Sequence, residues 1–430
     1  MNFGEAVRQL DGRQPEHMPK PNLDRISKLV TLLDHPELTF PTIHITGTNG
    51  KTTTARLVTA LACAHGLVAG TFISPHIGSV TERLSVCGAP ISEEEFAEVS
   101  THLAPYLDAV DAGDDRVTYF EVLTALAFLW CADKPIGLGV FEVGMGGTWD
   151  ATNVVAGDVA VICPVGLDHR ELGSTVEAVA AEKAGIIKEG KLAVIREQRP
   201  EALGVIERRA ADVGATLLLE GRDFRVLHRA PALGGQALEI RGKQGSYGEL
   251  FVPLFGEESA RNAAAAVAAL ESLLGRALDA NTVRGALAET ESTGRMEVAA
   301  RRPIVVLDGA HNPDAAAAVA RALPEAFRWT RLHLVIAAFE DKDVEGVAGF
   351  LAPLAARAYA CRNSSPRSAT GGRVATALRG AGVDEVSEHA SVAEALDAAR
   401  AAAAEDEIIL VTGSFYTVAD ARPLLTGAPS

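Results

Sequence analysis

The segment HITGTNGKTTT, at residues 44–54, has the residue types and spacing of a phosphate-binding loop. It follows a run typical of a strand, PTIHIT, and precedes a run typical of a helix. Gly47 and Gly50 allow the tight turn that points successive backbone N–H groups at an anion. Lys51 would reach the outer phosphates of a nucleotide, and the Thr52 hydroxyl would help to hold Mg2+. The alternative is an ordinary glycine turn between a strand and a helix, which the GK[ST]-type ending disfavours.

A second glycine-rich turn follows another apolar run, in VFEVGMGGTWDATN at residues 140–153. Glu142 ends this run, and a carboxylate at the carboxyl end of a parallel strand lies where α/β sheets bind their ligands. Mg2+ prefers oxygen ligands, few protein carboxylates and substrate phosphates. Glu142 is therefore a candidate magnesium ligand, with a solvated glutamate at a strand end as the alternative.

Three further polar residues stand beside turns. His169 and Lys183 lie in VGLDHRELGSTVEAVAAEKAGIIKEG, and their spacing alone indicates no more than a structural histidine and a solvated helical lysine. Asp308 ends the apolar run of VVLDGAHNPDA, where a glycine and an Asn-Pro pair tighten the loop that follows.

The elements that must position these residues alternate between short β-rich runs and Ala-rich helical runs, which predicts parallel sheets covered by helices. The expected strands are residues 41–46, 136–143, 159–165, 192–195, 303–308, 332–338, 356–361 and 408–413. The clearest helices are expected at residues 52–66 and 118–132. Between residues 220 and 255, alternating polar and apolar residues with glycine predict a small antiparallel appendage.

The polar stretch ETESTGRME, at residues 289–297, marks the expected domain boundary. We expect an α/β protein with two domains. Residues 1–292 would form a P-loop-type, mostly parallel sheet domain that carries the appendage. Residues 293–430 would form a smaller, Rossmann-like C-terminal α/β domain.

Composition limits the partners and the location. The 430 residues carry a formal net charge of −16, which disfavours nucleic acid and anionic membranes because the long-range field repels phosphate. Five scattered cysteines favour a reducing compartment and disfavour a disulfide framework or a structural zinc site. The N-terminus has no secretory pattern, and no apolar run approaches the roughly 20 residues of a membrane span. We expect a cytoplasmic protein with small-molecule substrates, and a monomer by default.

Together the motifs resemble one family, the dihydrofolate synthase/folylpolyglutamate synthase branch of the Mur ligases. The resemblance runs in family order along nearly the whole chain. It rests on GTNGKT, ISPHIGSVTERLSVCG, TYFEVLTALAF, EVGMGGTWDATNV, LDHRELG, EKAGIIK, GRMEV, LDGAHNP, DKDVEG and TGSFYTVADAR. The SPH, ERLS and DATNV segments favour the folate branch over the cell-wall ligases.

The resemblance implies an ATP-dependent ligase with Mg2+ at two sites. The ATP γ-phosphate would activate the carboxylate of dihydropteroate, or of the glutamate tail of a reduced folate, as an acyl phosphate. The α-amine of L-glutamate would then attack it and form an amide. Such a protein mainly positions reactants and neutralises charge. Both folate activities would use one site, so the sequence leaves open which of them are present.

The resemblance also implies roles for individual residues. ATP contacts carry over to Gly47, Thr48, Asn49, Gly50, Lys51, Thr52, Thr53, Asn262, Arg295 and Asp308. Magnesium ligands carry over to Thr52, Ser74, Glu142 and His169, and pteroate contacts to Thr118, Tyr119, Phe120, Glu121, Trp149, Asp150 and Ala151. The catalytic set is Lys51, His169, Lys183 and His311. Lys183 matches a position that is carbamylated in the family, with a simple ion pair as the alternative.

Two other functions stay open at this point. One is a Mur-type ligase that joins a different acid to a different amino acid and turns over no pteroate. The other is a nucleotide-binding regulatory protein that has lost turnover and would bind ATP without forming an amide.

Overall fold

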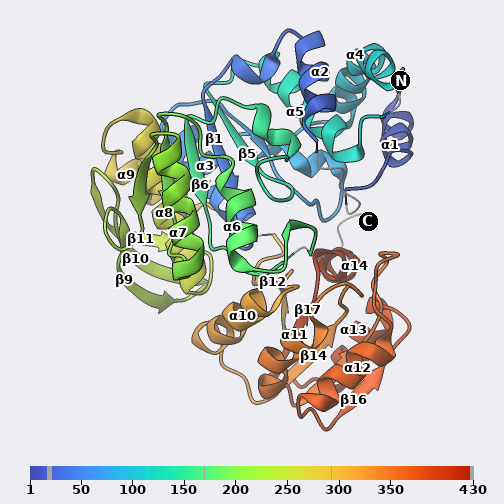
Figure 1. Cartoon of the computed structure of the whole chain (residues 1–430). Coiled ribbons are helices and arrows are strands. Elements are labelled where there is room, and N and C mark those ends of the chain that lie inside the picture. The colour runs from blue at the N-terminus through green and yellow to red at the C-terminus, as the bar shows by residue number, and fades with distance from the viewer. Residues whose placement is uncertain (17–21, 114, 169, 292, 427–430) are drawn as a thin grey trace. The chain divides into compact units, whose positions relative to one another are not determined.

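The computed structural model describes residues 1–16, 22–113, 115–168, 170–291 and 293–426. Their contacts divide the chain into two compact units, whose elements are shown in Figure 1. The first unit comprises Met1–His228, Leu238–Leu250 and Arg261–Thr290, and the second comprises Arg229–Ala237, Phe251–Ala260 and Glu291–Ser430. Two short segments before residue 290 thus group with the C-terminal part, and the division at residues 292 and 293 stays a prediction.

The first unit is built on an eight-stranded sheet of order β4-β3-β2-β5-β1-β6-β7-β8. Its strands are β1 (Thr42–Thr46), β2 (Ala69–Phe72), β3 (Leu84–Val86), β4 (Ala89–Pro90), β5 (Leu138–Glu142), β6 (Val159–Ile162), β7 (Leu192–Ile195) and β8 (Thr216–Leu219). The run from β2 to β8 is parallel, while β3 and β4 pair antiparallel at one edge. Every residue of β1 and β5 is buried, including the polar Thr42, His44 and Thr46 of β1 and Glu142 at the end of β5.

The helices α1–α9 belong to the first unit, apart from the first residues of α8. Their bounds are α1 (Phe3–Asp11), α2 (Asp24–Leu32), α3 (Lys51–Ala64), α4 (Glu93–Asp111), α5 (Tyr119–Ala132), α6 (Val176–Ala184), α7 (Pro200–Asp212), α8 (Glu257–Leu274) and α9 (Ala280–Ala288). Short 3-10 helices are η1 (Pro36–Leu38), η2 (Val80–Arg83), η3 (Ala151–Val154) and η4 (Arg170–Leu172). Helix α3 packs on β1, β2 and β5, and α5 packs on α2, α4 and β2. None of the described helices is long and apolar enough to cross a membrane.

The predicted appendage is a separate three-stranded sheet of order β11-β10-β9. Its strands are β9 (Arg225–Ala232), β10 (Gly235–Arg241) and β11 (Ser246–Val252). The connections between consecutive strands are short, as in antiparallel hairpins. Buried and exposed residues alternate along β10, which is the pattern from which the appendage was expected.

The second unit contains a six-stranded sheet of order β12-β13-β17-β14-β15-β16. Its strands are β12 (Glu297–Arg301), β13 (Ile304–Leu307), β14 (Leu332–Ile336), β15 (Arg357–Ala360), β16 (Val386–Glu388) and β17 (Ile408–Thr412). Its helices are α10 (Pro313–Ala326), α11 (Val344–Leu351), α12 (Gly371–Gly380), α13 (Val392–Ala402) and α14 (Phe415–Thr426), with the 3-10 helix η5 (Ala352–Leu354). Only β12 is antiparallel to its neighbour among the described strands of this sheet. The predicted fold class is confirmed in both units.

The cysteines contradict one expectation. Cys63 and Cys87 form a disulfide with a Cα–Cα distance of 5.8 Å, whereas the sequence argued against disulfides. Cys63 lies in the last turn of α3, and the backbone N–H of Cys87 donates to the Ala69 carbonyl at the start of β2. Helix α3, which contains Cys63, packs on β2, and β3, which Cys87 directly follows, pairs with β2. The two cysteines therefore meet beside β2. Cys131, Cys163 and Cys361 are free and buried.

Candidate active site

The loop that is predicted to bind phosphate lies between β1 and α3. Gly47 has φ +147° and Gly50, the N-cap of α3, has φ +91°, backbone conformations that glycine adopts at little cost. A Cβ atom on Gly47 would lie 2.5 Å from the Cβ of Cys163, which follows β6. Thr48 fastens the loop to the same segment, since its N–H donates to the Pro164 carbonyl at 2.9 Å. The loop is thus wedged against the neighbouring strand, with the N-terminus of α3 available to an anion.

Two lysines point at one carbonyl of this loop. The Nζ atoms of Lys51 and Lys183 donate to the carbonyl oxygen of Gly47 at 3.1 and 2.9 Å. Lys183, in α6, is only 4% exposed. Burial, together with repulsion from Lys51, lowers the pKa of Lys183 to about 7, while Asp168 and Asp150 act against the shift. Near neutral pH a substantial fraction of Lys183 is therefore an uncharged amine, which can act as a nucleophile.

Glu142 ends β5 and lies between two other predicted site residues. Its carboxylate is 1% exposed and accepts a hydrogen bond from the Thr52 hydroxyl at 3.0 Å. The backbone N–H of Ser74, just after β2, donates to the other carboxylate oxygen at 3.3 Å. Because β5 lies between β1 and β2, these residues meet at the carboxyl edge of the sheet.

This oxygen-rich group fits a magnesium ion. One carboxylate and two hydroxyl-bearing residues are suitable ligands, and a nucleotide would complete the coordination with its phosphate oxygens. The described part of the chain contains no group of three or more His, Cys, Asp or Glu side chains that could hold a metal ion by itself. A site that takes most of its ligands from substrate and water needs no such cluster. His169, the other expected ligand, lies outside the described residues.

The side chain of Asp150 holds the loop that contains Trp149, Asp150 and Ala151. Asp150 caps η3 and accepts hydrogen bonds from the N–H groups of Thr152 and Met145 at 3.0 and 2.9 Å. Burial raises the pKa of Asp150 to about 6, against these hydrogen bonds. The N–H of Trp149 donates to Glu182 at 3.2 Å, and Ala151 is buried in the core.

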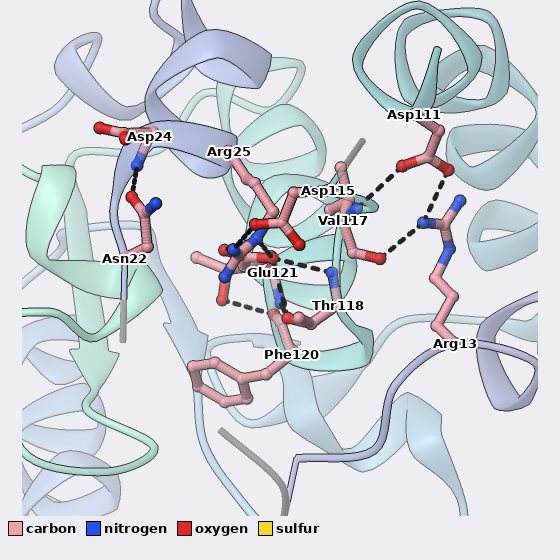
Figure 2. Close-up of polar contacts among 11 residues, drawn as sticks. Arg13, Asn22, Asp24, Arg25, Asp111, Asp115, Val117, Thr118, Phe120 and Glu121 are labelled. Atoms are coloured by element: carbon pink, nitrogen blue, oxygen red, sulfur yellow. Dashed lines mark hydrogen bonds and ion pairs between the residues drawn. The ribbon is translucent and has the colours of Figure 1, made fainter. Parts of the chain in front are cut away.

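The N-terminus of α5, with Thr118, Tyr119, Phe120 and Glu121, is held by a buried ion pair (Figure 2). The Nε of Arg25, in α2, donates to the two oxygens of Glu121 at 3.0 and 2.9 Å. Glu121 also accepts from the N–H and hydroxyl of Thr118, which caps the helix. The side chain of Glu121 is thus engaged within the protein, where it fixes the start of α5.

The rings beside this ion pair are packed as well. Phe120 lies 5.6 Å from Phe72 between ring centroids, and a Cβ on Gly144 would come within 2.5 Å of the Phe120 ring. The guanidinium of Arg83 stacks on the Tyr119 ring at 5.6 Å. Phe120 therefore links α5 to the turn that follows Glu142.

Asn262, in α8, faces the same loop. Its amide oxygen accepts a hydrogen bond from Arg196, and a Cβ on Gly50 would lie 2.9 Å from that oxygen. Arg196 was missed in the sequence. The rule that identified Glu142, a charged residue at the carboxyl end of a buried parallel strand, would also have identified Arg196, because it directly follows β7.

The remaining predicted residues lie in the second unit, at the end of β13. Asp308 is buried, which raises its pKa while the nearby Arg295 acts against the shift. It accepts hydrogen bonds from the N–H groups of Met296 and Ala310 at 2.9 and 2.8 Å. Arg295 stacks on Phe415 at 4.4 Å. His311 donates from Nδ1 to the Gly309 carbonyl at 3.0 Å, because a carbonyl can only accept.

Two family models match the chain. The Mur ligase middle domain matches residues 45–270, and the glutamate ligase domain of Mur ligases matches residues 294–415. A dihydrofolate synthase/folylpolyglutamate synthase of Mycobacterium tuberculosis is 38% identical, over 98% of this chain and 93% of its own length. The protein of that name from Bacillus subtilis is 33% identical, over 94% and 95%. The chain belongs to the dihydrofolate synthase/folylpolyglutamate synthase family of Mur ligases.

Solved structures agree with this membership. The M. tuberculosis folylpolyglutamate synthase complexed with ADP superposes on this Mur ligase with a TM-score of 0.95 and 37% identity, over 100% of this chain and 99% of the other. E. coli FolC in complex with DHPP and ADP gives a TM-score of 0.89 and 30% identity, over 99% and 98%. Both of these similar proteins are complexes with ADP.

We expect Gly47→Ala to weaken ATP binding by this Mur ligase more than backbone strain at a positive-φ residue alone would. The new methyl group would clash with Cys163, so that the loop must shift. The measurements are the KM for ATP and the free energy of unfolding. We expect KM to rise roughly tenfold or more, as when a well-aligned hydrogen-bonding site is lost. Gly66→Ala is the matched control, because Gly66 also has positive φ but has open space around it. Equal effects of the two substitutions would contradict the prediction.

We expect Glu121→Gln to destabilise the first unit by about 3 kcal/mol, because it leaves the buried guanidinium of Arg25 without its main counter-charge. Asp115→Asn removes the other carboxylate partner of Arg25, which is 45% exposed, and should cost under about 1 kcal/mol. Urea unfolding of both variants measures the difference. Similar decreases in the free energy of unfolding for the two variants would contradict the prediction that Glu121 is the main counter-charge of Arg25.

Proposed function

We propose that this protein is an ATP- and Mg2+-dependent ligase that forms an amide between L-glutamate and dihydropteroate, the glutamate tail of reduced folates, or both. The observation that supports it most is the joint position of Lys51, Thr52, Glu142 and Lys183 around one phosphate loop, in a chain of this family. The carboxylate oxygen of the acid attacks the γ-phosphorus of ATP, and ADP leaves. The glutamate amine then attacks the carbonyl carbon of the acyl phosphate, and inorganic phosphate leaves as the amide forms.

The protein groups mainly bind and neutralise charge in this reaction. The loop from Gly47 to Thr53 holds the ATP phosphates through its N–H groups, and Lys51 turns from the Gly47 carbonyl to the outer phosphates. Thr52, Ser74 and Glu142 would hold the first Mg2+, and Glu142 and His169 are proposed for a second. The metal, when bound, would supply positive charge to the phosphate oxygens.

Lys183 is proposed to act as a carbamate. Its uncharged amine adds to CO2, and the nitrogen loses a proton as the N-carboxylate forms. Three features support this: the amine is buried, its pKa is lowered to about 7, and Lys51 stands next to it as a cation that would pair with the new anion. The alternative is a simple ion pair of the Lys183 ammonium with a carboxylate, which Asp168 and Asp150 favour. It keeps a buried ammonium close to that of Lys51, which is electrostatically costly.

The other predicted residues have supporting roles in this proposal. Asn262 of the first unit and Arg295 and Asp308 of the second bind ATP, and His311 contacts the reacting groups. Residues 118–121 and 149–151 border the pteroate. Residues 1–292 and 293–430 act as the two functional domains, and the protein works as a monomer.

We place the reaction in the cytoplasm, because ATP is held inside cells. The Cys63–Cys87 disulfide is the observation that counts against this location, since disulfides are rare in reducing compartments.

The proposal predicts ADP formation and a product heavier by one glutamate residue when ATP, Mg2+ and L-glutamate are supplied with a folate acceptor. Dihydropteroate and tetrahydrofolate are offered separately, with mass spectrometry of the product. Turnover of dihydropteroate alone indicates a dihydrofolate synthase, and turnover of both acids a bifunctional enzyme. Turnover of tetrahydrofolate alone leaves only the polyglutamylating activity.

The same assay tests the site. Glu142→Gln should lower kcat by roughly a hundredfold or more, because it removes the only carboxylate that the Thr52 hydroxyl is seen to contact in the described residues. Glu177→Gln, on the exposed face of α6, is the control. ATP binding with neither folate acceptor used would refute the folate proposal, and another acid or a non-catalytic role would replace it.

Carbamylation predicts that activity depends on CO2. Enzyme kept in degassed, bicarbonate-free buffer should lose activity and regain it when bicarbonate is added. The dependence should steepen below about pH 7, because protonated Lys183 cannot add to CO2. Lys183→Arg keeps the positive charge but takes up no CO2 and should be inactive. An active Lys183→Arg variant, or wild-type activity indifferent to bicarbonate, would favour the ion pair.

A further inference from the structure

A buried charged network continues the active edge of the first sheet beyond the phosphate loop. The strand order β5-β1-β6-β7-β8 places Glu142, the phosphate loop and Cys163 at successive carboxyl ends. Arg196 directly follows β7 and Glu220 directly follows β8, so that both continue the same row. Their side chains are 0% and 4% exposed. Nothing in the mechanism above uses this pair.

The guanidinium of Arg196 donates hydrogen bonds to the side chains of Glu220 and Asn262. Its Nε donates to one oxygen of Glu220 at 2.9 Å, and its Nη1 donates to the amide oxygen of Asn262. The second oxygen of Glu220 forms an ion pair with Nε of Arg261 at 2.8 Å. The backbone N–H of Glu197 donates to Glu220 as well, at 2.7 Å. Glu220 thus neutralises Arg196 and holds the guanidinium in place.

This contact fixes the orientation of the Asn262 amide. A guanidinium carries donors only, so the Asn262 atom that faces Arg196 must be the oxygen. The NH2 group then points the other way as a donor. The amide lies against the nucleotide loop, because a Cβ on Gly50 would come within 2.9 Å of the amide oxygen and 3.1 Å of the amide nitrogen. Without Arg196, rotation of the amide by 180° would exchange donor and acceptor at this position.

We propose that Arg196 is a positioning residue for nucleotide binding. It holds the Asn262 amide with its NH2 group directed to the bound nucleotide and its flat face against Gly50. The role of Arg196 rests on the proposed ATP contact of Asn262. Arg196 itself touches neither the nucleotide nor the reacting atoms, and its effect passes through Asn262. Glu220 supports this role, because burying the Arg196 guanidinium without a carboxylate partner would destabilise the protein.

The first experiment removes the proposed contact between Asn262 and ATP without unfolding the protein. Asn262→Asp keeps an oxygen for Arg196 but has no NH2 donor, so the variant should stay folded while its KM for ATP rises roughly tenfold or more. The KM values for L-glutamate and the folate acceptor should stay within about twofold, because neither is bound by Asn262. An unchanged KM for ATP in Asn262→Asp would refute the proposed ATP contact and, with it, the role of Arg196.

The second experiment tests Arg196 directly. Arg196→Met should raise the KM for ATP to a similar extent, and adding Asn262→Asp to it should have little further effect, since both act on one contact. Arg196→Lys keeps a donor and the charge, and should give an intermediate KM. It also serves if the methionine variant does not fold. Arg261→Gln removes the other cation on Glu220 without touching the Asn262 amide oxygen, and its KM for ATP should stay close to wild type.

The outcomes distinguish the proposed ATP contact of Asn262 from the positioning role of Arg196. If Asn262→Asp raises the KM for ATP while the folded Arg196 variants do not, Asn262 binds ATP but Arg196 has only a structural role. Loss of thermal stability in Arg196→Lys with an unchanged KM for ATP would likewise assign Arg196 a structural role alone. A raised KM in Arg261→Gln equal to that in Arg196→Lys would also overturn the proposal, because the effect would then belong to the charge of the whole network.

Discussion

The carbonyl group of Gly47 is the point on which the active edge of the first unit depends. It accepts hydrogen bonds from Lys51 and Lys183, which reach it from different helices. Gly47 can serve in this way because it has no side chain and lies directly against Cys163. A protein with a net charge of −16 thereby brings two lysine amines to the place where phosphate would bind. Burial, together with repulsion from Lys51, lowers the pKa of Lys183 to about 7.

Strand order explains how the other groups arrive. Ser74 follows β2, Glu142 ends β5 and Thr52 follows β1. In the sheet β5 lies between β1 and β2, although it comes later than both in the sequence. Parallel strands end at one edge, so each strand delivers its last residue to the same row. The row continues through Arg196 and Glu220, and this is why a network far along the chain can orient Asn262 at the phosphate loop.

The carboxylates assigned to the pteroate region by resemblance are engaged inside the protein. Glu121 is bound by Arg25 and Thr118, and Asp150 by backbone N–H groups and Thr152. These bonds fix the start of α5 and the turn before η3. The start of α5 and the turn before η3 are therefore held rigidly. A rigid binding surface loses little conformational entropy when a substrate binds.

The sequence by itself predicted the two α/β sheets, the antiparallel appendage, the glycine turn between β1 and α3, and the position of Glu142 at the end of β5. These are local patterns: most of the buried strands are largely apolar runs, and a tight turn needs glycine. Lys183, Ser74 and Asn262 were found only through the resemblance, because a lysine, a serine or an asparagine carries no local signal of its own. The Cys63–Cys87 pair, the Arg25–Glu121 ion pair and the contact of Arg196 with Asn262 were decided by tertiary structure alone. Each joins residues whose distance depends on strand order and helix packing, and no spacing along one chain encodes those distances.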